Sequence, residues 1–153
     1  MDLITPLFTN RFLLTSLSSW FIAQIMKVIL NAFIHKKIVW ERLIGDGGMP
    51  SGHSATVSSL MVVCGLACGT GSAEFALSAV LALIVCHDAM GVRRETGKQA
   101  VLLNELTKAF SALADNKLPE VKLKEFVGHT PIQVIAGILI GIVNGIVMHA
   151  VLF

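Results

Sequence analysis

The chain has 153 residues, enough for one domain, and 54% of them are hydrophobic while only 14% are charged. A typical soluble domain carries about 25% charged residues, and the mean hydropathy here is +0.75. Disordered and collagen-like chains are excluded, and a net charge of +2 is too weak to indicate a nucleic-acid partner. The composition predicts a small integral membrane protein in which residues 1–153 form a single domain.

Four apolar stretches are expected to form helices, and the first covers residues 12–35. It is long enough to cross a bilayer, and it lacks the basic start and cleavage site of a signal peptide, so we expect a retained anchor. Residues 53–69 and 73–87 are shorter, and the small-residue turn at 68–72 between them predicts a membrane hairpin. With residues 131–153 as the last span, the predicted fold is an all-α, polytopic membrane bundle of about four spans.

Two polar segments, residues 36–52 and 88–130, separate these stretches. Within the second, residues 97–114 place apolar side chains at helical spacing, namely Val101, Leu102, Leu106, Ala109, Phe110 and Leu113. This spacing predicts an amphipathic helix before the last span. The helix either lies on the membrane surface or packs over the other helices.

With four spans, both polar segments lie on one side of the membrane and both termini on the other. Ten of the twelve Lys and Arg residues belong to these two segments, whereas Arg11 lies opposite and Lys27 lies within a span. The positive-inside rule therefore places the polar segments in the cytoplasm, with the protein in the plasma (inner) membrane.

One face of the first span carries Gln24, Lys27 and Asn31. A lysine within a span usually faces a protein interior or a wet cavity, because its insertion into lipid costs about 2.5–3.5 kcal/mol. Two interpretations remain open for Lys27. Its side chain either extends along the helix to the membrane surface or points into a polar site.

Small residues in the spans are expected to pack helices together. The last span has a glycine at every fourth position, a stripe that allows another helix to approach closely: Gly137, Gly141 and Gly145. The stripe predicts either tight packing inside the bundle or a face for a homo-oligomer. The cysteines lie in apolar runs and are expected to be packing residues without a disulfide or zinc: Cys64, Cys68 and Cys86.

The segment GGMPSGHS, residues 47–54, lies immediately before an apolar stretch. Its glycines permit a tight turn, Ser51 is placed to cap the following helix, and the amides at a helix start attract anions. His53 in the same turn can donate a proton to a bound anion. The alternative is a glycine-rich loop with a surface histidine.

A second histidine, His129, occupies the corresponding position before the last span, in the segment VGHTPIQV. Two histidines at one depth suit a nucleophile and a general acid in phosphoryl transfer. The intervening segment DAMGVRR adds Arg93 and Arg94, followed by Lys98. Guanidinium groups suit bidentate phosphate binding, although cations also border ordinary membrane helices.

Together, the blocks GGMPSGHSA, DAMGVRRETGKQA and GHTPIQVIAG resemble the divergent membrane branch of the type 2 phosphatidic acid phosphatase and vanadium-dependent haloperoxidase superfamily, over about residues 27–141. The resemblance implies that His129 attacks phosphorus and forms a phosphohistidine, while His53 protonates the leaving oxygen. It implies that Ser51 and Gly52 hold phosphate oxygens and that no metal or other cofactor is needed. The cations expected to complete the phosphate-binding set are Arg93, Arg94, Lys98 and Lys27.

The chain departs from the superfamily pattern in its charged residues. A lysine followed by Arg-Pro is absent, and Lys27, or Lys36 with Arg42, would replace it. The serine-arginine pair before the second histidine is also absent. The nearest cations there are Lys122 and Lys124, and Arg93 with Arg94 would supply the charge from a different place.

The position four residues after His129 is usually acidic in the superfamily, and here it is Gln133. An amide can orient the imidazole ring but cannot stabilise its cation by charge. Asp88 or Asp46 would have to supply a carboxylate from elsewhere. Orienting roles are therefore expected for Gln133 and Asp88.

The resemblance implies a metal-independent phosphatase that hydrolyses a phosphomonoester or pyrophosphate of a membrane lipid. One alternative is a phosphotransferase that passes the phosphoryl group to an alcohol. A second is a non-catalytic lipid-phosphate-binding or transport protein that keeps the anion site. Both histidines favour the enzyme, whereas Gln133 and the missing cation blocks favour the binding protein.

Overall fold

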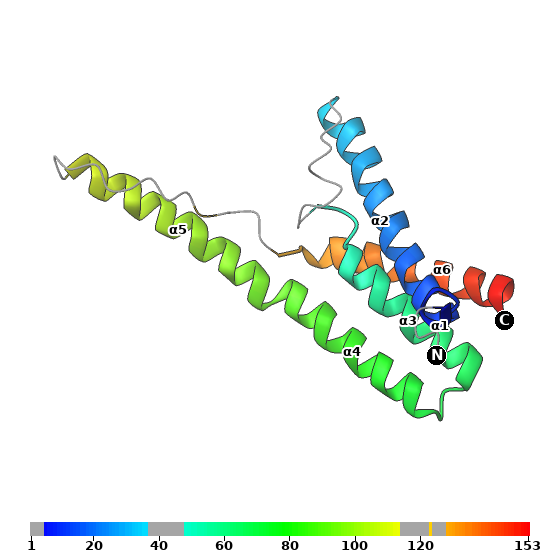
Figure 1. Ribbon diagram of the computed structural model, residues 1–153. Coiled ribbons are helices and arrows are strands. Elements are labelled where there is room, and N and C mark those ends of the chain that lie inside the picture. The colour runs from blue at the N-terminus through cyan, green and yellow to red at the C-terminus, as the bar shows by residue number, and fades with distance from the viewer. Residues whose placement is uncertain (1–4, 37–47, 114–122, 124–127) are drawn as a thin grey trace.

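The computed structural model describes residues 5–36, 48–113, 123 and 128–153, and all its regular elements there are helices. A single helical turn comes first and five longer helices follow: α1 (Thr5–Phe8), α2 (Arg11–His35), α3 (Gly52–Cys68), α4 (Ala73–Met90), α5 (Val92–Leu113) and α6 (Pro131–Leu152) (Figure 1). The four apolar helices begin and end close to the predicted limits. The prediction of an all-α membrane bundle is confirmed.

Three helical runs are long and apolar enough to cross a membrane: Arg11–Ile34, Ala73–Ala112 and Pro131–Leu152. The remaining apolar helix, α3, has only 17 residues. It runs antiparallel to α4, and Figure 1 shows both chain termini on the side of the α3–α4 turn. The described starts of α3 and α6 lie together at the other end of the bundle. The arrangement of the two polar segments on one side of the membrane stays a prediction.

Side-chain caps define where the helices begin. Asn10, Ser51 and Ser72 each accept a hydrogen bond from a backbone N–H in the first turn of α2, α3 and α4. Such a cap stabilises a helix by about 1 kcal/mol. Helix α6 begins with a capping box formed by Thr130 and Gln133. The predicted capping role of Ser51 is confirmed.

The turn between α3 and α4 forms the predicted hairpin. Gly69 has a φ of 86°, in the left-handed region that favours glycine. Its carbonyl accepts hydrogen bonds from both the backbone N–H and the hydroxyl of Ser72, at 3.2 and 2.8 Å. The chain thus reverses over a few small residues, as the sequence predicts.

The closest helix pair is α3 with α6, which run parallel along the glycine stripe. A Cβ added to Gly141 would lie 2.5 Å from the carbonyl oxygen of Ala55, and one added to Gly145 would lie 2.9 Å from the Cβ of Val62. One added to Gly137 would overlap the Ser51 carbonyl oxygen. The prediction of tight packing within the bundle is confirmed. The alternative of a homo-oligomer through this face is wrong, because α3 already covers all three glycines.

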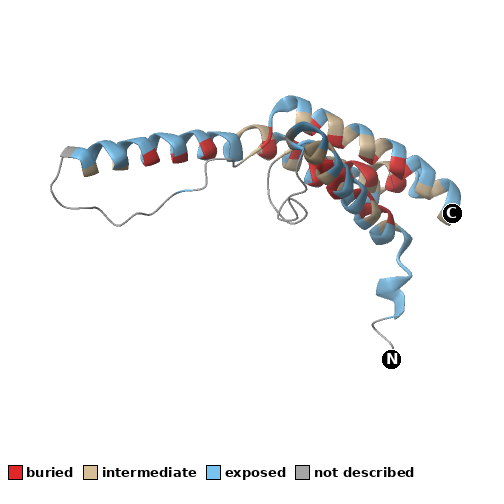
Figure 2. Ribbon diagram, turned by 90° about the horizontal axis from the view of Figure 1, so that it is seen from above, coloured by how far each residue is buried: buried red, intermediate tan, exposed pale blue. Residues whose placement is uncertain are grey.

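Helix α2 is joined to α6 by a buried polar cluster. The Asn144 side-chain amide donates to the Thr15 carbonyl at 3.2 Å, the Ser18 hydroxyl at 2.9 Å and the Ser19 hydroxyl at 2.7 Å. Hydrogen bonds between membrane helices contribute about 0.6–2 kcal/mol each. Figure 2 shows the buried residues gathered where α2, α3 and α6 meet.

Helix α5 begins at Val92, five residues before the predicted start at Gly97, and follows α4 after Gly91 alone. Figures 1 and 2 show it projecting away from the bundle. One of its faces is buried at Gly97, Ala100 and Asn104. The Asn104 amide exchanges two hydrogen bonds of 3.0 Å with the backbone of Leu123. The alternative in which this helix packs over the other helices is therefore wrong. The alternative in which it lies on the membrane surface stays a prediction.

We expect Gly141→Ala to destabilise the protein. The added methyl group meets the backbone of α3, which cannot move as freely as a side chain. Overpacking costs about 1–3 kcal/mol, which exceeds the roughly 1 kcal/mol that alanine gains over glycine in a helix. The measurement is the midpoint of thermal unfolding in detergent.

The matched control is Gly71→Ala, since a Cβ at Gly71 meets nothing within 4 Å. Equal midpoints for both variants would contradict the packing described here.

Candidate functional site

The starts of α3, α5 and α6 meet at one end of the bundle. The Ser51 N–H donates to the Gln133 carbonyl at 3.0 Å, which joins the starts of α3 and α6. The His129 N–H donates to the Ala89 carbonyl at 3.0 Å, which joins the segment before α6 to the end of α4. The sequence-predicted residues at this end are called the helix-end site below: Ser51, Gly52, His53, Arg93, Arg94, His129 and Gln133.

Gly128 brings His129 next to the two arginines. It has a φ of 88°, and a Cβ added there would lie 2.6 Å from the Cα of Arg94 and 2.6 Å from the carbonyl carbon of Arg93. The backbone before His129 thus lies directly on the first turn of α5. Sequence reasoning missed this contact, although the glycine preceding His129 was the signal for it.

His129 is buried, with 6% of its surface exposed, and its ring is oriented by Gln133. Nδ1 lies 3.2 Å from Gln133 Oε1, and the same oxygen accepts the Thr130 N–H at 3.0 Å. A backbone N–H can only donate, so the amide atom at this point is the oxygen. In the neutral ring this contact places the proton on Nδ1 and the lone pair on Nε2.

Ser51 and Gly52 form the first turn of α3 and are both buried. The Ser51 hydroxyl oxygen accepts the Ser54 N–H at 3.3 Å and the Ser54 hydroxyl at 2.9 Å. It accepts in both bonds, so its own proton can be donated elsewhere. His53 is the second residue of α3 and its side chain is exposed. The parallel starts of α3 and α6 both present the positive end of a helix dipole.

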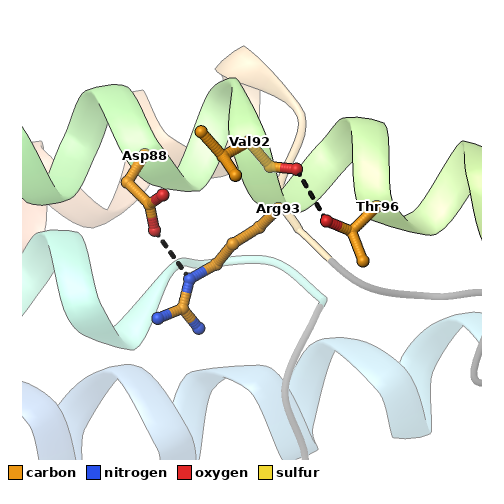
Figure 3. Close-up of polar contacts among 4 residues, drawn as sticks. All are labelled: Asp88, Val92, Arg93 and Thr96. Atoms are coloured by element: carbon orange, nitrogen blue, oxygen red, sulfur yellow. Dashed lines mark hydrogen bonds and ion pairs between the residues drawn. The ribbon is translucent and has the colours of Figure 1, made fainter.

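Arg93 is paired with Asp88 across the α4–α5 junction, with 2.8 Å between Nε and Oδ2 (Figure 3). Both side chains are substantially exposed, at 50% and 39%, and such pairs contribute about 0–1 kcal/mol. The pair uses one of the five N–H donors of the guanidinium. Asp88 was expected to orient the His129 ring. In the structure its carboxylate forms an ion pair with Arg93 instead.

Arg94 and Lys98 are exposed on α5. Lys98 forms an ion pair of 2.6 Å with Glu95 and lies more than a turn beyond Arg94 along the helix. The structure therefore brings Arg93 and Arg94 to His129 through Gly128, and it places Lys98 farther out on the projecting helix.

Helix α2 turns its polar face toward the glycine-rich turn. Lys27 and Gln24 are both buried, at 4% and 5% exposed. A Cβ on Gly48 would lie 3.4 Å from the Lys27 side chain, and one on Gly52 would lie 3.9 Å from Gln24 Cδ. Within the described part of the chain, Gln24 Oε1 is buried without a hydrogen-bond partner. This burial favours the interpretation in which Lys27 points into a polar site.

Four of the charged residues considered as substitutes lie outside the described residues: Arg42, Asp46, Lys122 and Lys124. Lys36 is exposed at the end of α2. Among the residues that the structure describes, no three His, Cys, Asp or Glu side chains gather closely enough to hold a metal ion. The helix-end site combines helix starts, guanidinium groups and histidines, a set suited to an anion.

The fold is that of a helical membrane protein in which the starts of α3, α5 and α6 meet at one end. The profile of the Divergent PAP2 family matches residues 8–144, and the chain belongs to this family. The resemblance to a divergent type 2 phosphatidic acid phosphatase family, inferred from the three sequence blocks, is thereby confirmed. The chain is also 40% identical over 151 residues to the uncharacterized membrane protein YuiD of Bacillus subtilis (strain 168), an alignment that covers 93% of this chain and 96% of YuiD. No solved structure shows a significant match to the chain.

We expect ¹⁵N NMR of histidine-labelled protein to show the neutral His129 ring protonated at Nδ1. Gln133→Leu removes the acceptor and should shift the tautomer ratio by about 2- to 10-fold, because one hydrogen bond contributes about 0.5–1.5 kcal/mol. Gln99→Leu, at an exposed position on α5, is the matched control. A ring protonated at Nε2 in the unmodified protein would refute the orientation by Gln133.

Proposed function

We propose that the helix-end site hydrolyses a phosphomonoester or pyrophosphate of a membrane lipid, with His129 as the nucleophile. The observation that carries this proposal is the contact between His129 Nδ1 and Gln133 Oε1. It leaves the lone pair on Nε2, the form in which imidazole attacks phosphorus. A nucleophile oriented by a fixed neighbour is the usual arrangement for covalent catalysis.

In the proposed first step, Nε2 of His129 forms a bond to phosphorus while the bond from phosphorus to the lipid oxygen breaks. The electron pair of that bond goes to the leaving oxygen, which takes a proton from His53. Water then attacks the phosphohistidine and His53 accepts a proton from it. Inorganic phosphate leaves and the neutral His129 ring is restored.

The charge on the phosphate oxygens would be stabilised by Arg93, Arg94 and the N–H groups at the start of α3. Donors that are already in position stabilise a transition state without reorganising, and one such donor is worth about 10²–10³ in rate. The membrane family and the position of the helix-end site at the ends of apolar helices support a lipid substrate.

We expect His129→Ala to abolish phosphate release from lipid phosphates, because no other residue of the helix-end site is a suitable nucleophile. His53→Ala should slow hydrolysis of an alkyl phosphate by about 10²–10⁴-fold. Its effect on an aryl phosphate should be much smaller, because that leaving oxygen needs no proton. Vanadate should inhibit the activity and EDTA should not.

The matched control is His149→Ala, since His149 lies near the opposite end of α6, stacked on Phe153. It should retain normal turnover. Equal losses with both substrates in His53→Ala would show that His53 is structural. A phosphoenzyme that persists in His129→Ala would refute the nucleophile, and loss of activity in EDTA that magnesium restores would refute the metal-free mechanism.

A non-catalytic lipid-phosphate-binding or transport protein is the second candidate function. The neutral amide of Gln133, which occupies the position of an orienting carboxylate, favours it. Such a protein would bind vesicles containing phosphatidic acid more tightly than phosphatidylcholine vesicles, in a manner dependent on Arg93 and Arg94, and would release no phosphate.

We further propose that the helix-end site faces the cytoplasm at the plasma membrane, because the Lys and Arg residues are concentrated on that side. Gly71→Cys and Lys108→Cys, each made in a background without the three native cysteines, test this orientation. An impermeant thiol reagent applied to intact cells should label position 71 and spare position 108. The reverse pattern would overturn the orientation, and labelling of both would overturn the topology.

A further inference from the structure

An open apolar groove of about 740 Å³ runs along α4 between α3 and α6. Its walls include Met61 of α3, Ala79, Leu83 and Ile84 of α4, and Ile138 of α6. Leu83 and Ile84 are largely exposed, so in a membrane the groove opens sideways to lipid. The mechanism proposed above does not use this groove.

One end of the groove reaches the helix-end site. Its lining includes Asp88, which is paired with Arg93, and Val92, which precedes Arg93 in the chain. Between them lies Ala89, whose carbonyl accepts the His129 N–H. A molecule in the groove would therefore have one end beside the Asp88–Arg93 ion pair and the other end among apolar side chains.

The dimensions of the groove suit a hydrocarbon chain. From Ala79 to Val92 the helical rise amounts to about 20 Å, at about 1.5 Å per residue, which exceeds the ~15 Å of one leaflet of a ~30 Å hydrocarbon core. The groove is open along one side, its walls are mostly apolar and its volume is about 740 Å³.

We infer that this groove binds the hydrocarbon chain of the lipid whose phosphate is held at the helix-end site. The inference rests on the proposed function for the identity of the head group. In a bilayer the chain gains little from leaving other lipid tails, since those are equally apolar. Preference for the groove therefore comes from the phosphate held at its end by the arginines.

Photo-crosslinking tests the inference with the full-length His129→Ala variant, which keeps the substrate intact. The probe is phosphatidic acid with a diazirine in one acyl chain, in phosphatidylcholine vesicles. We expect crosslinks to concentrate on Met61, Leu83 and Ile84, compared with exposed residues of α2 such as Leu17 and Phe21. Unlabelled phosphatidic acid should compete, and diacylglycerol with the same chains should not.

A pair of substitutions on α4 provides the matched control. Ala79→Phe fills the groove and should reduce these crosslinks several-fold, whereas Ala76→Phe, at an exposed position outside the groove lining, should not. Equal yields from both variants would overturn the inference, as would crosslinks in the parent variant that spread evenly over lipid-facing residues or that diacylglycerol displaces.

The crosslinking test of the groove and the phosphate-release test of the proposed hydrolysis can give different results. Phosphate release by the unmodified protein together with evenly spread crosslinks would refute the groove and leave the phosphatase standing. Competed crosslinks in the groove without phosphate release would support the groove and refute hydrolysis.

Discussion

The close approach of α3 to α6 is the constraint on which the rest of the structure depends. The two backbones come near enough that a single methyl group at Gly141 would overlap the neighbouring helix. Because the helices run parallel at this distance, their N-terminal turns lie side by side and the Ser51 N–H reaches the Gln133 carbonyl. The packing of a few glycines in the middle of the bundle thereby brings the segments that carry His53 and His129 to the same end.

Helix starts and charged side chains determine the electrostatics of this end. The starts of α3 and α6 contribute partial positive charge, and the segment before His129 contacts the backbone at Arg93 and Arg94, the first turn of a third helix. The residue that contacts His129 Nδ1 is Gln133, whose side chain is neutral. It orients the ring as a carboxylate would, yet it adds no negative charge that would weaken the attraction of the site for an anion.

Local patterns in the sequence predicted the helices, the Ser51 cap, the hairpin turn and the spacing of four that sets Gln133 against His129. Each depends on residues close together in the chain, where helical geometry determines the contact. The contact between Gly128 and Arg94 was not predicted, because it joins residues far apart in the chain. The pairs Glu95–Lys98 and Asp88–Arg93 are close in the sequence, but Lys98 was expected to bind phosphate and Asp88 to support His129, and their ion-pair partners were not considered. Helix α5 also begins five residues before its predicted start.

The brevity of α3 has a consequence for the surrounding lipid. Its 17 residues extend about 25 Å, whereas the hydrocarbon core of a bilayer is about 30 Å thick. This hydrophobic mismatch must be relieved, since α3 is held between longer neighbours and cannot lengthen. Either the bilayer thins around the protein or the polar start of α3 sits below the level of the head groups. Where the bilayer thins, the glycine-rich turn and the phosphates of nearby lipids come to the same level, so a lipid can present its head group without leaving the membrane.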